Sequence, residues 1–357
     1  MNSGARRVVI VGGGVIGMMS AFALVRRGHQ VVVIDPTPGE GASYAAAGMV
    51  APSAEVSIEH PELGDIAVTC LHDWPQLLDE LSDYFPEPLA LSTCGTLFVA
   101  YNASDRRELD RYLELAREGG HHFEHVSRVE RPALFDRLTP RISEGFFAPT
   151  DGFVDPDAVM KALRLATTSL GVEFVRDDAV STDTNVDGIA VVCASGDRVS
   201  GDVGLVATGY SSHPLTVSTL FPPHVRPIRG ITVRLVSNHH APSMTRGIVD
   251  GQWIYIVRRS QHSVLIGASS DESKDDVVEA GSLRRVLDDA LRLDPSLEEA
   301  SFDEVRVGLR PATSDHAPFF EVDSDGRWAW SSGHYRHGFL MAPDASRRAV
   351  TFVEGDA

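Results

Sequence analysis

The strongest constraint on the fold is a glycine-rich turn between a strand pattern and a helix pattern near the N-terminus. The run Val8–Val11 is β-branched, as expected for a strand that is buried on both faces. It leads into residues 12–17, whose sequence GGGVIG satisfies G-x-G-x-x-G. In this motif the first glycine allows a tight turn, the second lets the backbone approach a diphosphate, and the third lets helix and strand pack closely. Residues 16–27 then predict a helix that ends at Gly28, with its N-terminal dipole directed at the phosphates.

A second strand pattern, Gln30–Ile34, ends at Asp35, which lies 18 residues after Gly17. An acidic residue near this position holds a ribose hydroxyl in dinucleotide-binding folds. A chance glycine turn is the alternative, but the order of strand, glycines, helix, strand and acid favours a dinucleotide site. The acid disfavours a phosphorylated ribose and leaves FAD or NAD. The small-residue stretch 43–49 suits a backbone that lies against a flat ligand, and residues 205–209, a strand that ends in a tight Ala-Thr-Gly turn, predict a second contact region.

Four separated stretches resemble the D-amino acid oxidase family of flavoproteins, and most closely its glycine oxidase branch. They are residues 12–17, residues 43–49 with Pro52 and Glu55, residues 308–315, and residues 333–343. The resemblance implies an α/β fold with an FAD-binding, Rossmann-like domain of the glutathione-reductase type. It also implies an interleaved α+β substrate domain built on an antiparallel sheet. We expect the FAD domain at 1–86, 150–226 and 304–357, and the substrate domain at 87–149 and 227–303. The length of 357 residues agrees with about two domains.

Hydrophobic periodicity predicts the elements between these motifs. Helices are expected near 105–119, 157–170 and 281–293, and the last helix is expected to be short because a charged stretch follows Pro343. Strands are expected at 96–100, 171–175, 179–184, 189–194 and 199–207, and antiparallel strands at 230–235, 247–250, 253–258 and 263–268.

The resemblance implies FAD-dependent oxidative deamination of a small amino acid or amine. A hydride would pass from the substrate Cα to flavin N5, water would hydrolyse the imine, and O2 would reoxidise the flavin to give H2O2. The flavin would perform the chemistry, so no catalytic side chain is expected. Covalent attachment in related sarcosine oxidases uses a cysteine in the third FAD segment; no cysteine follows Cys193, so the FAD is expected to be noncovalent.

Four alternatives stay open at this point. The first is a D-amino acid dehydrogenase that passes electrons to a quinone or another acceptor. The second is a pathway-specific amine oxidase of specialised metabolism. The third is a flavoprotein that acts on tRNA, and the fourth is a nucleotide-binding protein without catalysis.

Four residues are candidates for binding the substrate. Arg310, in an expected Leu-Arg-Pro turn, resembles the family's carboxylate-binding arginine, because a guanidinium holds a carboxylate through two parallel bonds; the alternative is a structural pair with Asp315. Arg336 would reach toward substrate, or else face solvent. Strand alternation puts Tyr255 on one face with Trp253 and Val257, either as a carboxylate ligand or as a core tyrosine. Ser270 stands where the branch often has Met, which implies a more polar pocket.

The motifs and the resemblance predict cofactor contacts in all three FAD segments. Backbone amides at the start of the last helix, within 334–340, would stabilise negative charge at the N1–C2=O edge of the flavin. The predicted residues are Gly12, Gly14, Val15, Ile16, Gly17, Asp35, Pro36, Ala42, Ser43, Ala47, Gly48, Met49, Val180, Thr208, Gly209, Gly333, His334, Tyr335, Arg336, His337, Gly338, Phe339 and Leu340.

Charge and composition limit the partners. With 32 basic and 50 acidic residues the net charge is −18, which disfavours nucleic acid. No apolar window reaches the ~18–20 residues that span a bilayer, and the three cysteines lack CxxC spacing, so we expect a cytoplasmic protein. The histidines at 121, 122, 125, 239 and 240 lack a metal-ligand pattern, and no metal is expected. The expected partners are a small carboxylate-bearing amine and O2, with a homo-oligomer as a family-based expectation.

Overall fold

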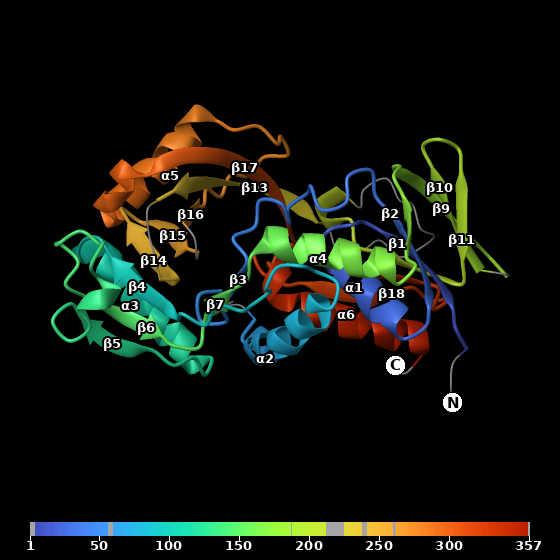
Figure 1. Cartoon of the computed structure of the whole chain (residues 1–357), viewed down its shortest axis with the longest axis horizontal. Helices are drawn as coiled ribbons and strands as arrows, with labels where there is room; N and C mark the ends of the chain where they lie inside the picture. Colours follow the sequence, from blue (N-terminus) through green and yellow to red (C-terminus); the bar gives the residue numbers. More distant parts are fainter. Residues whose placement is uncertain are drawn as a thin grey trace.

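Two large sheets dominate the computed structural model, which describes residues 4–55, 60–186, 188–211, 225–237, 241–259 and 262–355. A six-stranded sheet and an eight-stranded sheet lie toward opposite sides of the molecule, and helices α1 (Val15–Arg26), α4 (Pro156–Ser169) and α6 (Gly338–Glu354) lie toward the centre (Figure 1). Segments far apart in the chain therefore meet between the two sheets.

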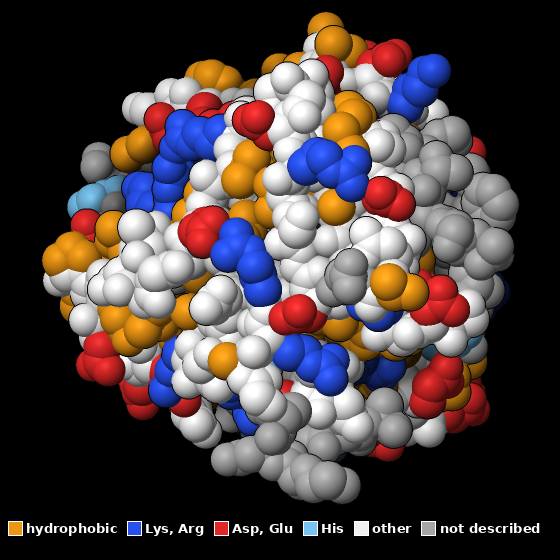
Figure 2. Space-filling view, turned by 90° about the vertical axis from the view of Figure 1, so that its right-hand side faces the viewer, with side chains coloured by type: hydrophobic (Ala, Val, Ile, Leu, Met, Phe, Trp, Pro, Cys, Tyr) orange, Lys and Arg blue, Asp and Glu red, His pale blue; other side chains and the backbone are white. Residues whose placement is uncertain are grey.

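On the face shown in Figure 2, acidic and basic side chains are interspersed. Binding along a phosphate backbone uses a continuous basic stripe instead. Among the described residues, no helix combines the length and the hydropathy needed to cross a bilayer.

The six-stranded sheet is built around β1, whose residues Val8–Val11 are almost fully buried. Its strands run parallel except for the edge strand β18. In spatial order they are β18 (Phe319–Val322), β19 (Trp328–Ser332), β12 (Val203–Val206), β1 (Arg7–Val11), β2 (Gln30–Ile34) and β8 (Glu173–Val175). Burial on both faces explains why β1 and β2 read as continuous apolar runs rather than as alternating ones.

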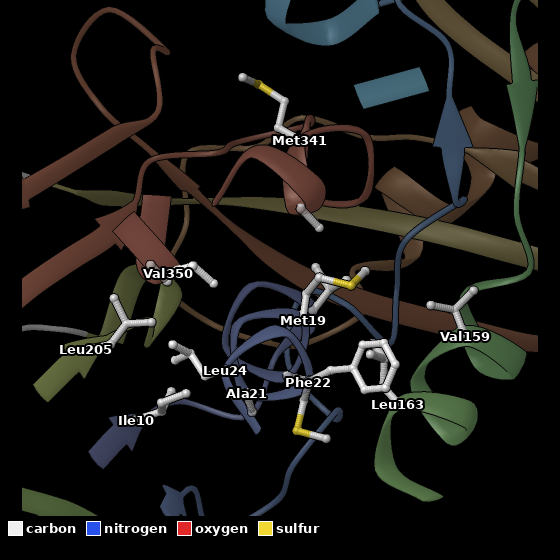
Figure 3. Close-up of a cluster of buried hydrophobic side chains, with 14 of the residues drawn as sticks. Ile10, Met19, Ala21, Phe22, Leu24, Val159, Leu163, Leu205, Met341 and Val350 are labelled. Atoms are coloured by element: carbon white, nitrogen blue, oxygen red, sulfur yellow. The ribbon is translucent and has the colours of Figure 1, made fainter. Parts of the chain in front are cut away.

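Each face of this sheet has its own cover. On one face, α1 packs with Val159 and Leu163 of α4 and with Met341 and Val350 of α6 (Figure 3). The other face carries Val9 and Val11, which pack against a three-stranded antiparallel sheet of β9 (Ala179–Asn185), β10 (Gly188–Cys193) and β11 (Arg198–Gly201). Helix α2 (Glu62–Ser82) adds Leu71, Trp74 and Leu78 to the α1 side.

The eight-stranded sheet forms the second half of the molecule. Helix α5 (Ala280–Leu293) covers one face and α3 (Ala103–Glu118) covers the other. All neighbours are antiparallel except β14 and β4. The order is β17 (Ser301–Ala312), β13 (Arg226–Val236), β16 (Ser263–Gly267), β15 (Gln252–Arg258), β14 (Ser243–Val249), β4 (Thr96–Ala100), β6 (Glu144–Ala148) and β5 (Glu124–Ser127). The remaining elements are β3 (Met49–Val50), β7 (Gly152–Phe153) and short 3-10 helices at Pro132–Leu134, Gly209–Ser211 and Pro295–Glu299.

Three local predictions are wrong. Residues 199–207 form two strands rather than one, because the chain crosses between sheets at Asp202, whose carboxylate accepts a bond from the Arg7 amide. Arg310 lies inside β17 rather than in a turn, paired opposite Ile228. The last helix is 17 residues long rather than short, because residues well beyond Pro343, such as Ala349 and Val353, bury against α1. In addition, β17 runs across the expected domain boundary at 304, and α2 is a helix that is not among those expected from the sequence.

Candidate active site

A single cavity of about 480 Å³ joins the two halves of the molecule. One end is lined by the glycine turn after β1 and by residues 177–179 and 207–209. The other end is lined by residues of β13, β14, β15 and β17 and by the segment before α6. The glycine turn and the polar side chains of the sheet therefore line one continuous space.

Most predicted residues line this cavity. They are Gly12, Gly14, Val15, Ile16, Asp35, Pro36, Ala42, Ser43, Ala47, Gly48, Met49, Thr208, Gly209, Tyr255, Arg310, His334, Tyr335, Arg336, Gly338 and Phe339.

Six predicted residues do not line the cavity. Gly17 packs against Gly12, and Leu340 lies in the core beside α1. Gly333 and His337 are buried just behind the wall. The Val180 side chain is 43% exposed, and its neighbour Ala179 lines the cavity instead, as side-chain alternation along a strand requires. Ser270 is exposed and reaches the site through its hydroxyl, 3.4 Å from the Tyr335 hydroxyl.

The glycine turn leaves no room for side chains. A Cβ on Gly12 would lie 2.4 Å from the Ala207 carbonyl oxygen, and a Cβ on Gly17 would lie 2.0 Å from the Gly12 oxygen. Gly12 also has φ +108°, which disfavours residues with a side chain. These two contacts match the roles of the first and third glycines of the motif, the tight turn and the close packing of helix on strand.

Hydrogen bonds hold this turn in shape. The Asp35 carboxylate accepts from the Gly13 amide at 2.6 Å and from the Thr37 amide at 2.8 Å. The Ser43 hydroxyl accepts from the Val15 amide at 3.0 Å, while Gly14, the N-cap of α1, supplies no side-chain cap. Ser43 thus occupies the Val15 amide, while the positive end of the α1 dipole faces the cavity that Gly14, Val15 and Ile16 line. These groups fit an FAD diphosphate and ribose.

Helix α6 also begins at the cavity. Its N-cap, His337, supplies no side-chain hydrogen bond, and the first helical residues, Gly338 and Phe339, line the space. Burial lowers the pKa of His334 to about 4, and burial also lowers the pKa of His337, with smaller contributions from neighbouring charges. Both imidazoles are therefore neutral near pH 7. The positive end of the α6 dipole is the feature that can stabilise negative charge here.

Arg310 projects from β17 across the neighbouring strand. Its guanidinium lies over Gly230, where a Cβ would approach Nη2 to 2.1 Å. Nη1 donates to the Ser269 carbonyl at 3.1 Å. Burial, together with Arg336, lowers the pKa of Arg310 from its ordinary value. No described carboxylate lies within ion-pair distance of it, and Asp315 pairs with His60 instead. Arg310 therefore retains donors for an anion in the cavity.

Tyrosines surround this arginine. Burial raises the pKa of Tyr255 to about 12, so its hydroxyl stays protonated, and that hydroxyl lies over Gly267. Burial raises the pKa of Tyr335, but Arg336, Ser270 and Arg310 lower it, and the net shift is downward. Tyr335 stacks on His316 with ring centroids 4.6 Å apart, and the exposed Arg336 lies over its ring at 4.9 Å.

Sequence reasoning missed a charged pair at this end. Arg246 of β14 donates to the Glu55 carboxylate at 2.9 Å; both residues are buried and both line the cavity. The Arg246 guanidinium also lies 5.0 Å from the centre of the Trp253 ring. A signal was present: an Asp250-Gly251 turn predicts a two-residue hairpin, and the resulting register puts Arg246 opposite Tyr255.

Metal ligands do not gather at this site. In the part of the chain that the structure describes, no three His, Cys, Asp or Glu side chains cluster as metal ligands would. His239 and His240 lie outside the described residues.

Comparison with known proteins identifies the cofactor and the class of enzyme. The profile of the FAD dependent oxidoreductase family, DAO, matches residues 7–350. The chain belongs to this family.

Individual relatives agree with the family assignment. Glycine oxidase of Geobacillus kaustophilus is 29% identical over 354 residues, which cover 97% of this chain and 92% of that protein. The bifunctional protein ThiO/ThiG of Trichormus variabilis is 29% identical over 368 residues, covering 98% of this chain but only 52% of the larger protein. The crystal structure of the Geobacillus glycine oxidase superimposes with a TM-score of 0.88 at 27% identity, covering 98% and 95% of the two chains.

These comparisons confirm the predicted family, the predicted fold class and FAD as the cofactor of an oxidoreductase. The domain spans and the individual site residues stay predictions.

Proposed function

We propose that this FAD-dependent oxidoreductase removes hydrogen from the carbon beside the amine of a small amino acid, and that O2 is its electron acceptor. The products would be an imine, which water hydrolyses to an oxo acid and an amine or ammonia, and H2O2. The relatives named glycine oxidase support this reaction class. FAD, when bound, accepts the hydride and passes the electrons on.

The observation that carries the proposal is Arg310. A half-buried guanidinium without a protein carboxylate, at the end of a cofactor channel, is costly unless a ligand supplies an anion. Its planar fork suits a carboxylate, and the Ser269 carbonyl fixes its orientation. The Tyr255 hydroxyl, on the same wall, can donate a further bond to the same carboxylate.

The surrounding residues would orient the substrate and exclude water. Carboxylate binding by Arg310 and Tyr255 would hold the substrate in one orientation, so that its Cα faces the channel. Tyr335, stacked on His316, would form an adjacent wall beside the exposed Arg336. Since His334 and His337 are neutral, the positive charge near this wall comes from arginines.

The test is anaerobic bleaching of the bound flavin by a panel of glycine, sarcosine, D- and L-amino acids and cyclic imino acids. Bleaching by at least one amino acid is expected, and none would reject the proposal. Peroxide release in air would then distinguish an oxidase from a dehydrogenase that uses a quinone. Finding FAD released by denaturation, rather than retained on the chain, would support noncovalent binding.

Arg310→Met tests the carboxylate site. Losing two charge-assisted hydrogen bonds, each about 1.5–3 kcal/mol, predicts a rise in KM of roughly 10²–10⁴-fold while FAD stays bound. Arg284→Met, on the exposed surface of α5, is the matched control. An unchanged KM would remove Arg310 from the site.

A further inference from the structure

Arg246 is a buried arginine that lines the cavity and that the proposed reaction does not use. It is 7% exposed and donates one hydrogen bond to Glu55. Its Nε has no hydrogen-bond partner among the described residues. A guanidinium offers five N–H donors, so this contact with Glu55 leaves Arg246 under-used.

The register of the sheet puts Arg246 and Arg310 on the same wall. Arg246 is paired directly opposite Tyr255, and Tyr255 directly opposite Gly267, so these three positions share one face. The Arg310 guanidinium lies over Gly230 on the same cavity-lining face, beside the strand that carries Gly267.

The distance between the two guanidiniums follows from the spacing of the strands. The Arg310 guanidinium lies over β13, the Tyr255 hydroxyl over β16, and the Arg246 guanidinium near the ring of Trp253 on β15. These strands are consecutive neighbours in the sheet. Strands lie ~4.8 Å apart, so the two guanidiniums are on the order of 10 Å apart with Tyr255 between them. That span suits a small molecule with an acidic group at each end.

The charges lining this end also exceed what one carboxylate neutralises. Arg246, Arg310 and Arg336 are positive, and Glu55 is negative. Glu55 also lies 3.9 Å from the His337 imidazole, which is neutral near pH 7 because burial lowers its pKa. Two positive charges therefore remain beyond Glu55.

We propose that Arg246 binds a second acidic group, so that the substrate is an amino dicarboxylate rather than glycine. This rests on the proposed function, because it names the substrate class for the same site. Arg310 would hold the carboxylate beside the reacting carbon, and Arg246 the carboxylate at the far end of the substrate.

The test uses two ethers that carry no amine. Oxydiacetate has two carboxylates and methoxyacetate has one, and the flavin spectrum of the holoenzyme reports the binding of each. We expect oxydiacetate to bind at least ~10-fold more tightly, as one additional charge-assisted contact predicts. In Arg246→Met this advantage is lost, in Arg246→Lys part of it is kept, and in the control Arg284→Met it is unchanged.

A double variant is the control for misfolding of Arg246→Met. Arg246→Met alone leaves Glu55 buried without its partner, so Arg246→Met with Glu55→Gln removes both charges and is expected to lose the same preference. Equal affinity of the wild type for the two ethers would overturn the inference, as would a preference that survives the double variant.

Reduction by amines separates this inference from the proposed function. Iminodiacetate, D-aspartate and D-glutamate are compared with glycine and sarcosine in anaerobic bleaching, and at least one dicarboxylate is expected to bleach faster than both monocarboxylates. If no amine bleaches the flavin, the proposed function fails while the ethers still test Arg246. If glycine bleaches fastest and the ethers bind equally, only the inference fails.

Discussion

Gly230→Ala displaces the Arg310 guanidinium without removing any charge. An added Cβ would lie 2.1 Å from Nη2 and 2.2 Å from both Cζ and Nη1 of Arg310. Ordinary contact needs about 3.5 Å, so the guanidinium must move by about 1.4 Å. The Ser269 bond, now 3.1 Å long, would be strained or lost. Misplacement of a substrate-positioning group by ~1 Å costs roughly 10²-fold in rate.

We therefore expect kcat/KM of Gly230→Ala to fall by about 10²-fold with the best substrate of the bleaching panel. FAD content and melting temperature should stay near wild type, since alanine is tolerated in a strand interior and Gly230 lacks a positive φ. Gly281→Ala is the matched control, because an added Cβ there meets no atom within 4 Å. Unchanged kinetics in Gly230→Ala would refute the assignment of Arg310 to substrate positioning.

Two further predictions address the cofactor channel and a buried carboxyl. In Gly17→Ala the new Cβ would lie 2.0 Å from backbone, so we expect protein purified without stoichiometric FAD, measured as flavin absorbance per chain; full occupancy would contradict the packing argument. Burial raises the pKa of Asp151 to about 6 from its model-compound value of 3.8, outweighing the bonds from Ser53 and Thr96. Between those values the folded state binds the proton more tightly, so stability falls as pH rises from about 4 to 6, by up to about 3 kcal/mol. Chemical unfolding at pH 4 and pH 7 should show this loss in the wild type and not in Asp151→Asn; parallel pH profiles would disprove it.

Much of the fold was predictable because its signals are local. The expected helices at 105–119, 157–170 and 281–293 correspond to α3, α4 and α5, with ends that differ by at most two residues. Alternation in β15 correctly grouped Trp253, Tyr255 and Val257, which pack in one cluster. The failures were at points where tertiary contacts decide, such as the crossing at Asp202 between two sheets.

Prediction of the site was uneven for the same reason. Residues 12–17 and residues 42–49 are each a contiguous stretch, and the small side chains of each stretch already indicated a ligand. Glu55 belongs to one of the stretches that resemble the family, but no role was predicted for it. Arg246 lies in none of these stretches. The prediction of Val180 missed by one residue, since Ala179 lines the cavity instead: neighbouring residues of a strand point to opposite faces.

The sequence by itself determined the nucleotide-binding half, because a G-x-G-x-x-G turn, its flanking strand and helix, and the acid at Asp35 specify local backbone geometry. Only the tertiary structure decided the substrate half. There Arg246, Tyr255 and Arg310 come from three different strands, and Glu55 comes from a loop that is far from all three in sequence. The Asp250-Gly251 turn aligns Arg246 with Tyr255 locally, but only long-range strand pairing and packing bring Arg310 and Glu55 to the same wall.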